Sequence, residues 1–334
     1  MNKRIRTVIL ITMIIATLLS GCTIANKEYV LDLNNVGRNS VFSVNGEECS
    51  IKEAKLYLCN YQNLYGKEYG VDLWGYEFDK ENAPSTLEEY VKDITLLQLS
   101  NIMCMNQLAK QMKITLTEEE ERLVEKAAET YYGSLNKEEQ KYIGMDKKDL
   151  IKFYNKYAIA EKLYRQLTQG VNEEVSIDEA RAIRIQQIYV ASADKAKDVQ
   201  KKLDKGEDFA ITAGTYNEAK NIEITVVRGT LPDIVEEMAY ILDDGQQTEM
   251  IETEDGYYFI KCLSKNVEEL TEKNKENIIA KRKKEQFDDV FQSFVDESEF
   301  EIRQKLWDEV TIDTSGNIVT KSFFEVYDTY FTEE

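Results

Sequence analysis

The chain has 334 residues, and its 62 Asp and Glu against 42 Lys and Arg give a formal net charge of −20 with no histidine. This charge argues against nucleic-acid binding, which draws its affinity from Lys and Arg on phosphates. The missing histidine excludes the usual Ser-His-Asp hydrolase triad but leaves a Ser-Lys arrangement open. The length suggests two domains, and 31% charged residues with only two prolines favour long solvated helices.

The first 21 residues have the form of an export signal. Three basic residues precede an apolar run over residues 8–19, which is shorter than the ~20 residues of a membrane span. The run ends in LSGC, which resembles a bacterial lipobox and implies cleavage before Cys22 with a lipid on its thiol. We therefore expect a chain tethered to the extracytoplasmic face of a bacterial membrane, with residues 22–37 as a linker. Without its signal the chain keeps 39 basic and 62 acidic residues, a net charge of −23.

The other four cysteines give no metal-binding pattern. The sequence has no C-x-x-C pair, and without histidine the common zinc ligand sets are missing. We expect no metal site and no cofactor. If Cys49 and Cys59 lie on one helix, they are roughly 15 Å apart, which is too far for a disulfide between them. The sequence predicts free core thiols at Cys49, Cys59, Cys104 and Cys262.

Residues 38–175 are predicted to be helical. Capping boxes, in which a Ser or Thr is followed three residues later by Glu, occur at Ser50, Ser85, Thr117 and Ser176. Apolar residues recur at helical spacing after Ser50 and Ser85, and further helices are expected over residues 118–132 and 147–167. Before the first helix, FSVNGEE predicts a short strand and an Asn45-Gly46 turn, which leads into a hairpin or directly into the helix.

The pattern changes after residue 176. A strand over residues 183–190 is followed by helices over 192–205 and 208–216, a strand near 222–227, a helix over 231–242 and a hairpin at Asp255-Gly256. From residue 271 a long charged helix resumes the earlier style. The segment 176–266 is thus predicted to be an insertion between two helical parts, 38–175 and 267–312. The role of residues 313–334, a docking tail or a packed segment, stays open.

This middle segment resembles a parvulin-type peptidyl-prolyl isomerase domain, and its flanks resemble the chaperone part of the PrsA and SurA foldases. The resemblance is carried by KKLDKGEDFAITA, RGTLPDIVEEMAYILDDGQ and EDGYYFIKC in the middle, and by SVNGEECSIKEAKLYL and QLAKQMKITLTEEE before it. It implies an α+β fold. A mainly helical SurA-like chaperone domain, discontinuous in sequence, would hold an inserted parvulin-like domain of a four-stranded sheet with helices.

The same resemblance implies a site and two departures from it. Gln187 and Tyr258 stand where parvulins generally carry histidines, and Glu218 is the acidic residue nearest to a further family position. The substrate pocket would be lined by Leu231, Val235 and Tyr240. The alternative is structural, with Gln187 satisfying a neighbouring backbone group and the other residues packing in the core.

The resemblance leads to a lipid-anchored folding factor that cradles unfolded or partly folded secreted polypeptides between its two parts. A second hypothesis is an active parvulin-type isomerase that uses Gln187 and Tyr258 in place of histidine. Neither side chain titrates near neutral pH, which favours the first hypothesis. A solute-binding lipoprotein is a third, more distant hypothesis, because such a protein would alternate strands and helices through both halves.

Overall fold

The computed structural model describes residues 37–69, 73–77 and 86–331, which form two compact units. One unit contains the described residues up to Gly170 together with those from Lys284 onward, and the other is Val171–Lys283. The predicted signal, Cys22 and the linker lie outside the described residues. Within the described part of the chain, no helix has the length and apolar character needed to cross a bilayer.

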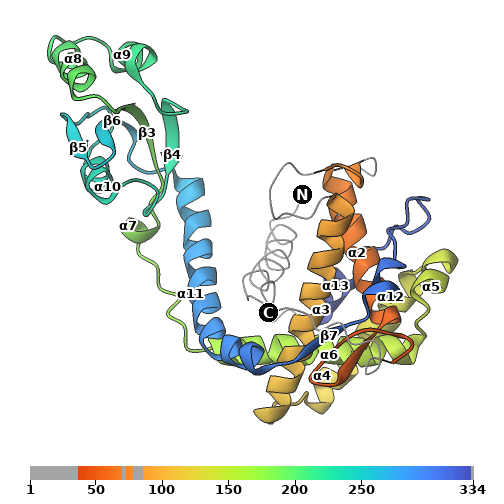
Figure 1. Ribbon diagram of the computed structural model, residues 1–334. Coiled ribbons are helices and arrows are strands. Elements are labelled where there is room, and N and C mark those ends of the chain that lie inside the picture. The colour runs from red at the N-terminus through yellow and green to blue at the C-terminus, as the bar shows by residue number, and fades with distance from the viewer. Residues whose placement is uncertain (1–36, 70–72, 78–85, 332–334) are drawn as a thin grey trace. The chain divides into compact units, whose positions relative to one another are not determined.

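The first unit is mostly helical (Figure 1). Its helices pack by amphipathic faces, and in α4 the residues Val124, Ala127, Ala128 and Tyr131 fall at helical spacing and are all buried. In chain order its elements are β1 (Ser40–Val44), β2 (Glu47–Ser50), α2 (Ile51–Tyr69), α3 (Leu87–Gln111), α4 (Glu118–Ser134), α5 (Lys137–Ile143), α6 (Lys147–Thr168), the end of α11 (Glu268–Glu297), β7 (Phe300–Ile302), α12 (Gln304–Asp308) and α13 (Phe323–Phe331).

A small antiparallel sheet joins the two ends of this unit. Its strand order is β2-β1-β7, so β1 pairs with a strand that lies more than 250 residues later. Asn45 and Gly46 turn β1 into β2 with positive φ angles of 50° and 78°, which Asn and Gly tolerate best. Helix α2 begins directly after β2. The sheet shows that the helical parts on either side of the insertion share one body.

The C-terminal residues complete the core of this unit. Phe323 of α13 is fully buried and stacks on Tyr154, with ring centroids 4.3 Å apart. Its backbone N–H donates to Asn60 Oδ1, and its carbonyl accepts from the Tyr154 hydroxyl at 2.8 Å. The Glu139 carboxylate of α5 accepts from the backbone N–H groups of residues 319 and 320. The described part of the predicted tail is thus packed and does not project as a free docking segment.

The second unit is built around a four-stranded antiparallel sheet with the order β4-β3-β6-β5. Figure 1 shows α8 and α9 together and α10 apart from them around this sheet. Its elements are α7 (Ile177–Ala180), β3 (Ile183–Val190), α8 (Ala193–Asp204), α9 (Phe209–Tyr216), β4 (Glu223–Val226), α10 (Asp233–Tyr240), β5 (Ile251–Thr253), β6 (Gly256–Ser264) and the first part of α11.

The two faces of this sheet bury separate apolar clusters. Ile188 and Val190 of β3 pack with residues of α8 and α9, whereas Ile183 and Ile185 pack with residues of α10. The alternation follows from the two-residue period of a strand. Gly256 begins β6 with φ +148°, and a Cβ atom there would lie 2.7 Å from the Val190 carbonyl oxygen. The sheet therefore has one face for α8 and α9 and one for α10.

The predicted α+β fold class is confirmed, while two local predictions need correction. Helix α3 is capped by Thr86, whose side chain accepts from the Glu89 N–H, and the predicted cap Ser85 lies outside the described residues. Ser85 is followed three residues later by Glu88, and Thr86 by Glu89, so the sequence alone does not decide which of the two is the cap. At the later hairpin the turn residues are Glu254 and Asp255, and Gly256 already belongs to β6.

Candidate functional site

The predicted pair Gln187 and Tyr258 lies on one face of the second unit's sheet. In the antiparallel register of β3 and β6, Gln187 is opposite Ile260, and Tyr189 is opposite Tyr258. Because directly opposite residues share a face and alternate residues along a strand do too, all four side chains project to the α10 side. The rings of Tyr189 and Tyr258 are in contact, with centroids 4.9 Å apart.

Gln187 is engaged in holding the backbone of a neighbouring segment. Its side chain is 8% exposed, and its Nε2 donates to the Asn221 carbonyl at 2.9 Å. Its own backbone N–H donates to the Ile222 carbonyl at 2.8 Å. Both bonds fix the residues that lead into β4. This is the arrangement that the structural alternative describes.

Tyr258 is half-buried against the apolar cluster of the α10 face. Burial raises the pKa of its phenol above the ordinary value, and the neighbouring Tyr189 adds to the effect. The hydroxyl therefore stays protonated at neutral pH. It can donate or accept a hydrogen bond but does not act as a base there.

The three residues predicted to line a pocket differ in exposure. Val235 is fully buried and Tyr240 is 5% exposed, so both belong to the core between α10 and the sheet. Leu231, just before α10, is half-buried and packs against the same cluster. The structure brings the three together with Tyr258, but a ligand outside this core reaches only Leu231 and Tyr258.

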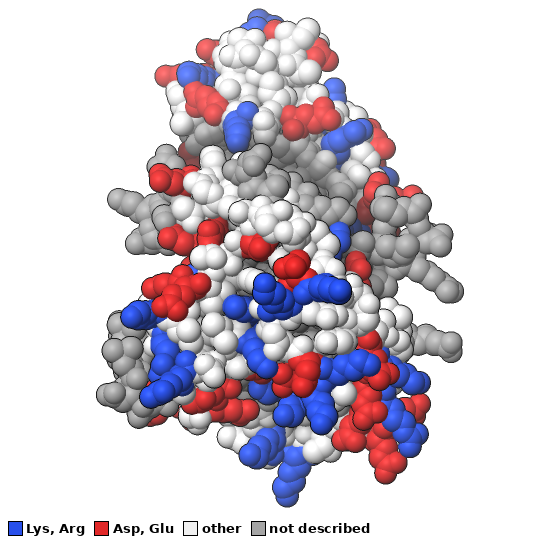
Figure 2. All heavy atoms as spheres, turned by 90° about the vertical axis from the view of Figure 1, so that its right-hand side faces the viewer, with Lys and Arg blue, Asp and Glu red and all other residues white. Residues whose placement is uncertain are grey.

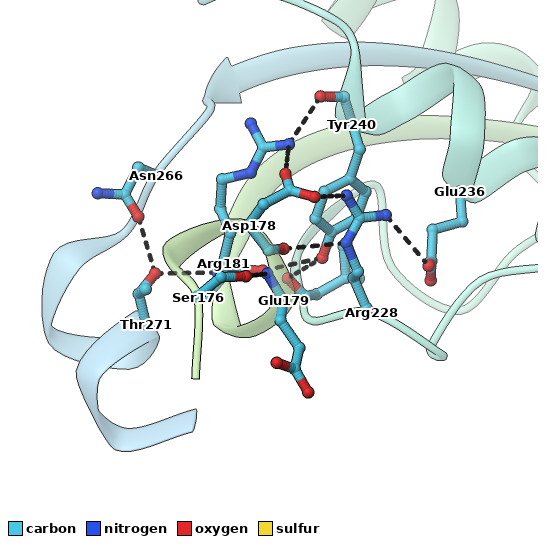
Figure 3. A network of polar contacts seen from close by, with 11 residues as sticks. Ser176, Asp178, Glu179, Arg181, Arg228, Glu236, Tyr240, Asn266 and Thr271 are labelled. Atoms are coloured by element: carbon cyan, nitrogen blue, oxygen red, sulfur yellow. Dashed lines mark hydrogen bonds and ion pairs between the residues drawn. The ribbon is translucent and has the colours of Figure 1, made fainter. Parts of the chain in front are cut away.

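Tyr240 is held by a network of polar contacts, shown in Figure 3. Two guanidinium groups contact its ring, and their carbons lie 4.3 Å (Arg228) and 5.1 Å (Arg181) from the ring centroid. Its hydroxyl donates to the Arg181 carbonyl at 3.0 Å, and the Arg181 Nη2 donates to the Tyr240 carbonyl at 3.0 Å. Burial raises the pKa of Tyr240 to about 12, and Glu236 contributes to the rise.

Asp178 joins the two arginines of this network. One carboxylate oxygen accepts from Arg181 at 2.8 Å, and the other accepts from Arg228 at 2.7 Å. Arg228 also forms an ion pair with Glu236 of α10 at 3.8 Å. These charged hydrogen bonds connect α7, the segment after β4, and α10. The sequence reasoning missed Asp178, Arg181 and Arg228, and the only local signal was the Asp178–Arg181 spacing of three residues on a short helix.

Glu218 takes no part in the network around Tyr240 and instead connects two neighbouring segments of the chain. It is exposed, accepts from the Ala191 N–H at 2.8 Å, and pairs with Lys195 at 2.5 Å. The bond from Lys195 and that from Ala191 lower the pKa of its carboxyl below the ordinary value. Glu218 is thus ionised and ties the end of β3 to the start of α8. It is not a proton donor.

The predicted site residues on this face offer hydrogen bonds and apolar contact. Across residues 37–69, 73–77 and 86–331 there is no group of three or more His, Cys, Asp or Glu side chains able to hold a metal. Cys49, Cys59, Cys104 and Cys262 are buried and form no disulfide within the described part of the chain, and burial raises the pKa of the Cys262 thiol. A buried neutral thiol is a poor nucleophile.

On the face seen in Figure 2, acidic and basic side chains lie interspersed among uncharged ones. The sequence has more acidic than basic residues, but this face shows no continuous acidic patch. Interspersed charge is what keeps an exterior solvated.

Comparison with known proteins finds foldases named PrsA among the relatives of this chain. No protein-family model matches the chain. The foldase protein PrsA of Clostridium botulinum (strain Loch Maree / Type A3) is 23% identical over 261 residues, which cover 68% of this chain and 75% of the relative. The foldase protein PrsA 3 of Bacillus anthracis is 30% identical over 160 residues, which cover 46% of this chain and 56% of that protein.

Among solved structures, the crystal structure of the peptidylprolyl isomerase PrsA from Bacillus cereus covers 76% of this chain and 99% of its own, with 21% identity and a TM-score of 0.37. The stronger relationship is that of sequence, since the Clostridium botulinum relative matches over 68% of the chain. These sequence relationships make the chain a homologue of the PrsA-type foldases.

Proposed function

We propose that the chain is an extracytoplasmic folding factor that binds unfolded or partly folded secreted polypeptides, and that a lipid on Cys22 tethers it to the cell membrane. The relatives named foldase PrsA support the first part. The LSGC sequence supports the second. A tether keeps the factor where secreted chains emerge unfolded, with their apolar segments still exposed.

The second unit, Val171–Lys283, holds polypeptide without accelerating the isomerisation of its prolyl bonds. The observation that carries this proposal is the fixed position of Tyr240, whose ring contacts two guanidinium groups and whose hydroxyl donates to a backbone carbonyl. An isomerase must lower a barrier of roughly 18–20 kcal/mol by favouring a twisted amide. A pocket for proline needs apolar walls that a ligand can reach, and here Val235 and Tyr240 are buried.

An active isomerase is the second candidate. One observation favours it, namely that Gln187 and Tyr258 lie on the same sheet face in adjacent strands. Hydrogen bonds from fixed groups can stabilise a twisted amide without any proton transfer. Against it, the Nε2 of Gln187 is already bound to the Asn221 carbonyl.

A single experiment separates the two candidates. An unfolded secreted protein whose refolding is limited by proline isomerisation, over tens of seconds or longer, is refolded with and without the purified chain. The proposal expects reduced light scattering from aggregates at stoichiometric amounts, and no acceleration of the slow phase at substoichiometric amounts. An accelerated slow phase would establish the isomerase instead. Unchanged scattering with unchanged rates would refute both candidates.

A further inference from the structure

Helix α10 turns an apolar stripe toward solvent. Ile234 is 51% exposed, Met238 is 39% exposed and Ile241, at the C-cap, is 73% exposed. Their spacing of four and three residues places them on one side of the helix. The opposite side carries Val235 and Tyr240, which are buried against the sheet. The helix is therefore apolar on both sides, and only one of them is covered.

The chain around this stripe carries one sign of charge. Between Gly229 and Ile260 there are nine Asp and Glu and no Lys or Arg. Asp233 and Glu237 are exposed on α10 itself, and Asp243 and Asp244 follow directly after it. Asp243 is paired with Lys265 at 2.7 Å, which neutralises part of this charge at the C-terminal end of the helix. Glu236 is likewise paired with Arg228, at 3.8 Å, which leaves Asp233 and Glu237 as the exposed carboxylates on the helix itself.

We propose that the α10 surface, defined as Ile234, Met238 and Ile241 with Asp233 and Glu237, binds client segments in which Lys or Arg alternates with apolar side chains. The inference rests on the proposed function and specifies its substrate class. Apolar contact supplies affinity, and the acidic side chains select a cationic segment by complementary charge. The same charge disfavours anionic lipid, nucleic acid and a second copy of this acidic chain.

The test uses the purified full chain and three labelled peptides of equal length. One alternates lysine with leucine, the second has glutamate in place of lysine, and the third keeps lysine but has serine in place of leucine. Fluorescence anisotropy measures their affinities at low and at higher salt. The proposal expects the first peptide to bind at least about tenfold more tightly than either other peptide, with the charge preference shrinking as salt screens it.

Substitutions then locate the binding surface. The double substitution Ile234→Ser and Ile241→Ser is expected to weaken binding of the first peptide by roughly a hundredfold. Each isoleucine that the peptide buries contributes roughly a tenfold change, and the two changes multiply. The matched control pair, Ile177→Ser and Ile211→Ser, changes residues that are 63% and 64% exposed in the same unit but not on α10, and should leave the affinity unchanged.

Charge reversal gives a second, independent location test. Glu237→Lys should weaken the first peptide and strengthen the glutamate peptide, because the residue is exposed beside the stripe. Glu276→Lys makes the same change at an exposed position of α11 and should do neither. All of these positions are at the surface, so the variants should melt within a few degrees of the parent chain.

The outcomes distinguish this inference from the proposed function. Equal affinity for the lysine and glutamate peptides, or an equal loss in the α10 and control pairs, would overturn the α10 surface. Self-association of the chain that the Ile234→Ser and Ile241→Ser pair abolishes would also overturn it, because the occupant would be a second copy. In each case the parent chain would still suppress aggregation of an unfolded client. Loss of that suppression refutes the proposed function itself.

Discussion

Replacing Tyr240 by phenylalanine separates a core residue from a ligand-contacting one. Tyr240→Phe keeps the ring and its contacts with Arg181 and Arg228, and removes only the hydroxyl that donates to the Arg181 carbonyl at 3.0 Å and lies 3.4 Å from the Val226 carbonyl. A buried hydrogen bond contributes about 0.5–1.5 kcal/mol, and a buried carbonyl left without its donor adds a further cost. We expect the second unit to lose about 1–2 kcal/mol of stability.

The assay must report on the second unit. Both tryptophans, Trp74 and Trp307, lie in the first unit, so tryptophan fluorescence does not follow this loss. Hydrogen exchange of the β3 amides follows this loss of stability. Where the exchange rate is proportional to the equilibrium constant for opening, 1–2 kcal/mol corresponds to roughly 5- to 30-fold faster exchange. Affinity for an unfolded client should not change, because the hydroxyl points into the core.

A half-buried tyrosine on the same sheet provides the control. Tyr257→Phe removes a hydroxyl that makes only a long contact, 3.4 Å, with Glu252, and should change exchange less than about twofold. The reasoning is refuted if Tyr240→Phe leaves β3 exchange unchanged and weakens client binding, since Tyr240 would then act as a wall of an accessible pocket.

Three further predictions concern stability. Phe323→Ala should lower the free energy of unfolding of the first unit by about 3–5 kcal/mol, measured in urea, because the ring is fully buried among tyrosines and phenylalanines. A loss below about 1 kcal/mol would contradict the packing of α13. Burial raises the pKa of Glu161 to about 7 and that of Asp328 to about 6, so the folded chain holds protons that the unfolded chain loses near pH 4. Stability should therefore fall by on the order of 4 kcal/mol from pH 5 to pH 8, and Asp328→Asn should reduce this fall. A flat profile in the parent chain would count against the assignment. Gly256→Ala should destabilise the second unit by about 2 kcal/mol or more, because the new Cβ atom clashes with β3. Gly214 on α9 faces open space, so the control Gly214→Ala should not destabilise the unit. Thermal melting measures both effects.

Local patterns predicted most of the elements. The Asn45-Gly46 turn, the Thr117 cap and the helical spacing of Leu150, Tyr154 and Ala158 each depend on residues a few positions apart, and the structure has the hairpin, the helix start and the buried face. The pairing of β1 with β7 joins residues more than 250 positions apart. No local pattern specifies such a partner, and only the resemblance suggested that the two helical parts form one domain.

The site was harder to predict because burial and side-chain partners depend on the whole fold. The resemblance singled out Gln187 and Tyr258, and the structural alternative expected a backbone partner for Gln187. Nothing in the sequence specified that this partner would be the Asn221 carbonyl. The contact of Tyr240 with Arg181 joins residues 59 positions apart, which no local pattern specifies. By contrast, Phe323, Tyr327 and Phe331 recur every four residues, a helical signal at the C-terminus that could have been recognised.

The central claim is that this chain recognises polypeptide in its unfolded state. The most direct measurement compares the affinity of the purified chain for one secreted protein in two forms, native and permanently unfolded by reduction and alkylation of its disulfides. We predict saturable binding of the unfolded form, at least tenfold tighter than that of the native form. No binding of the unfolded form, or equal binding of both forms, would contradict the account.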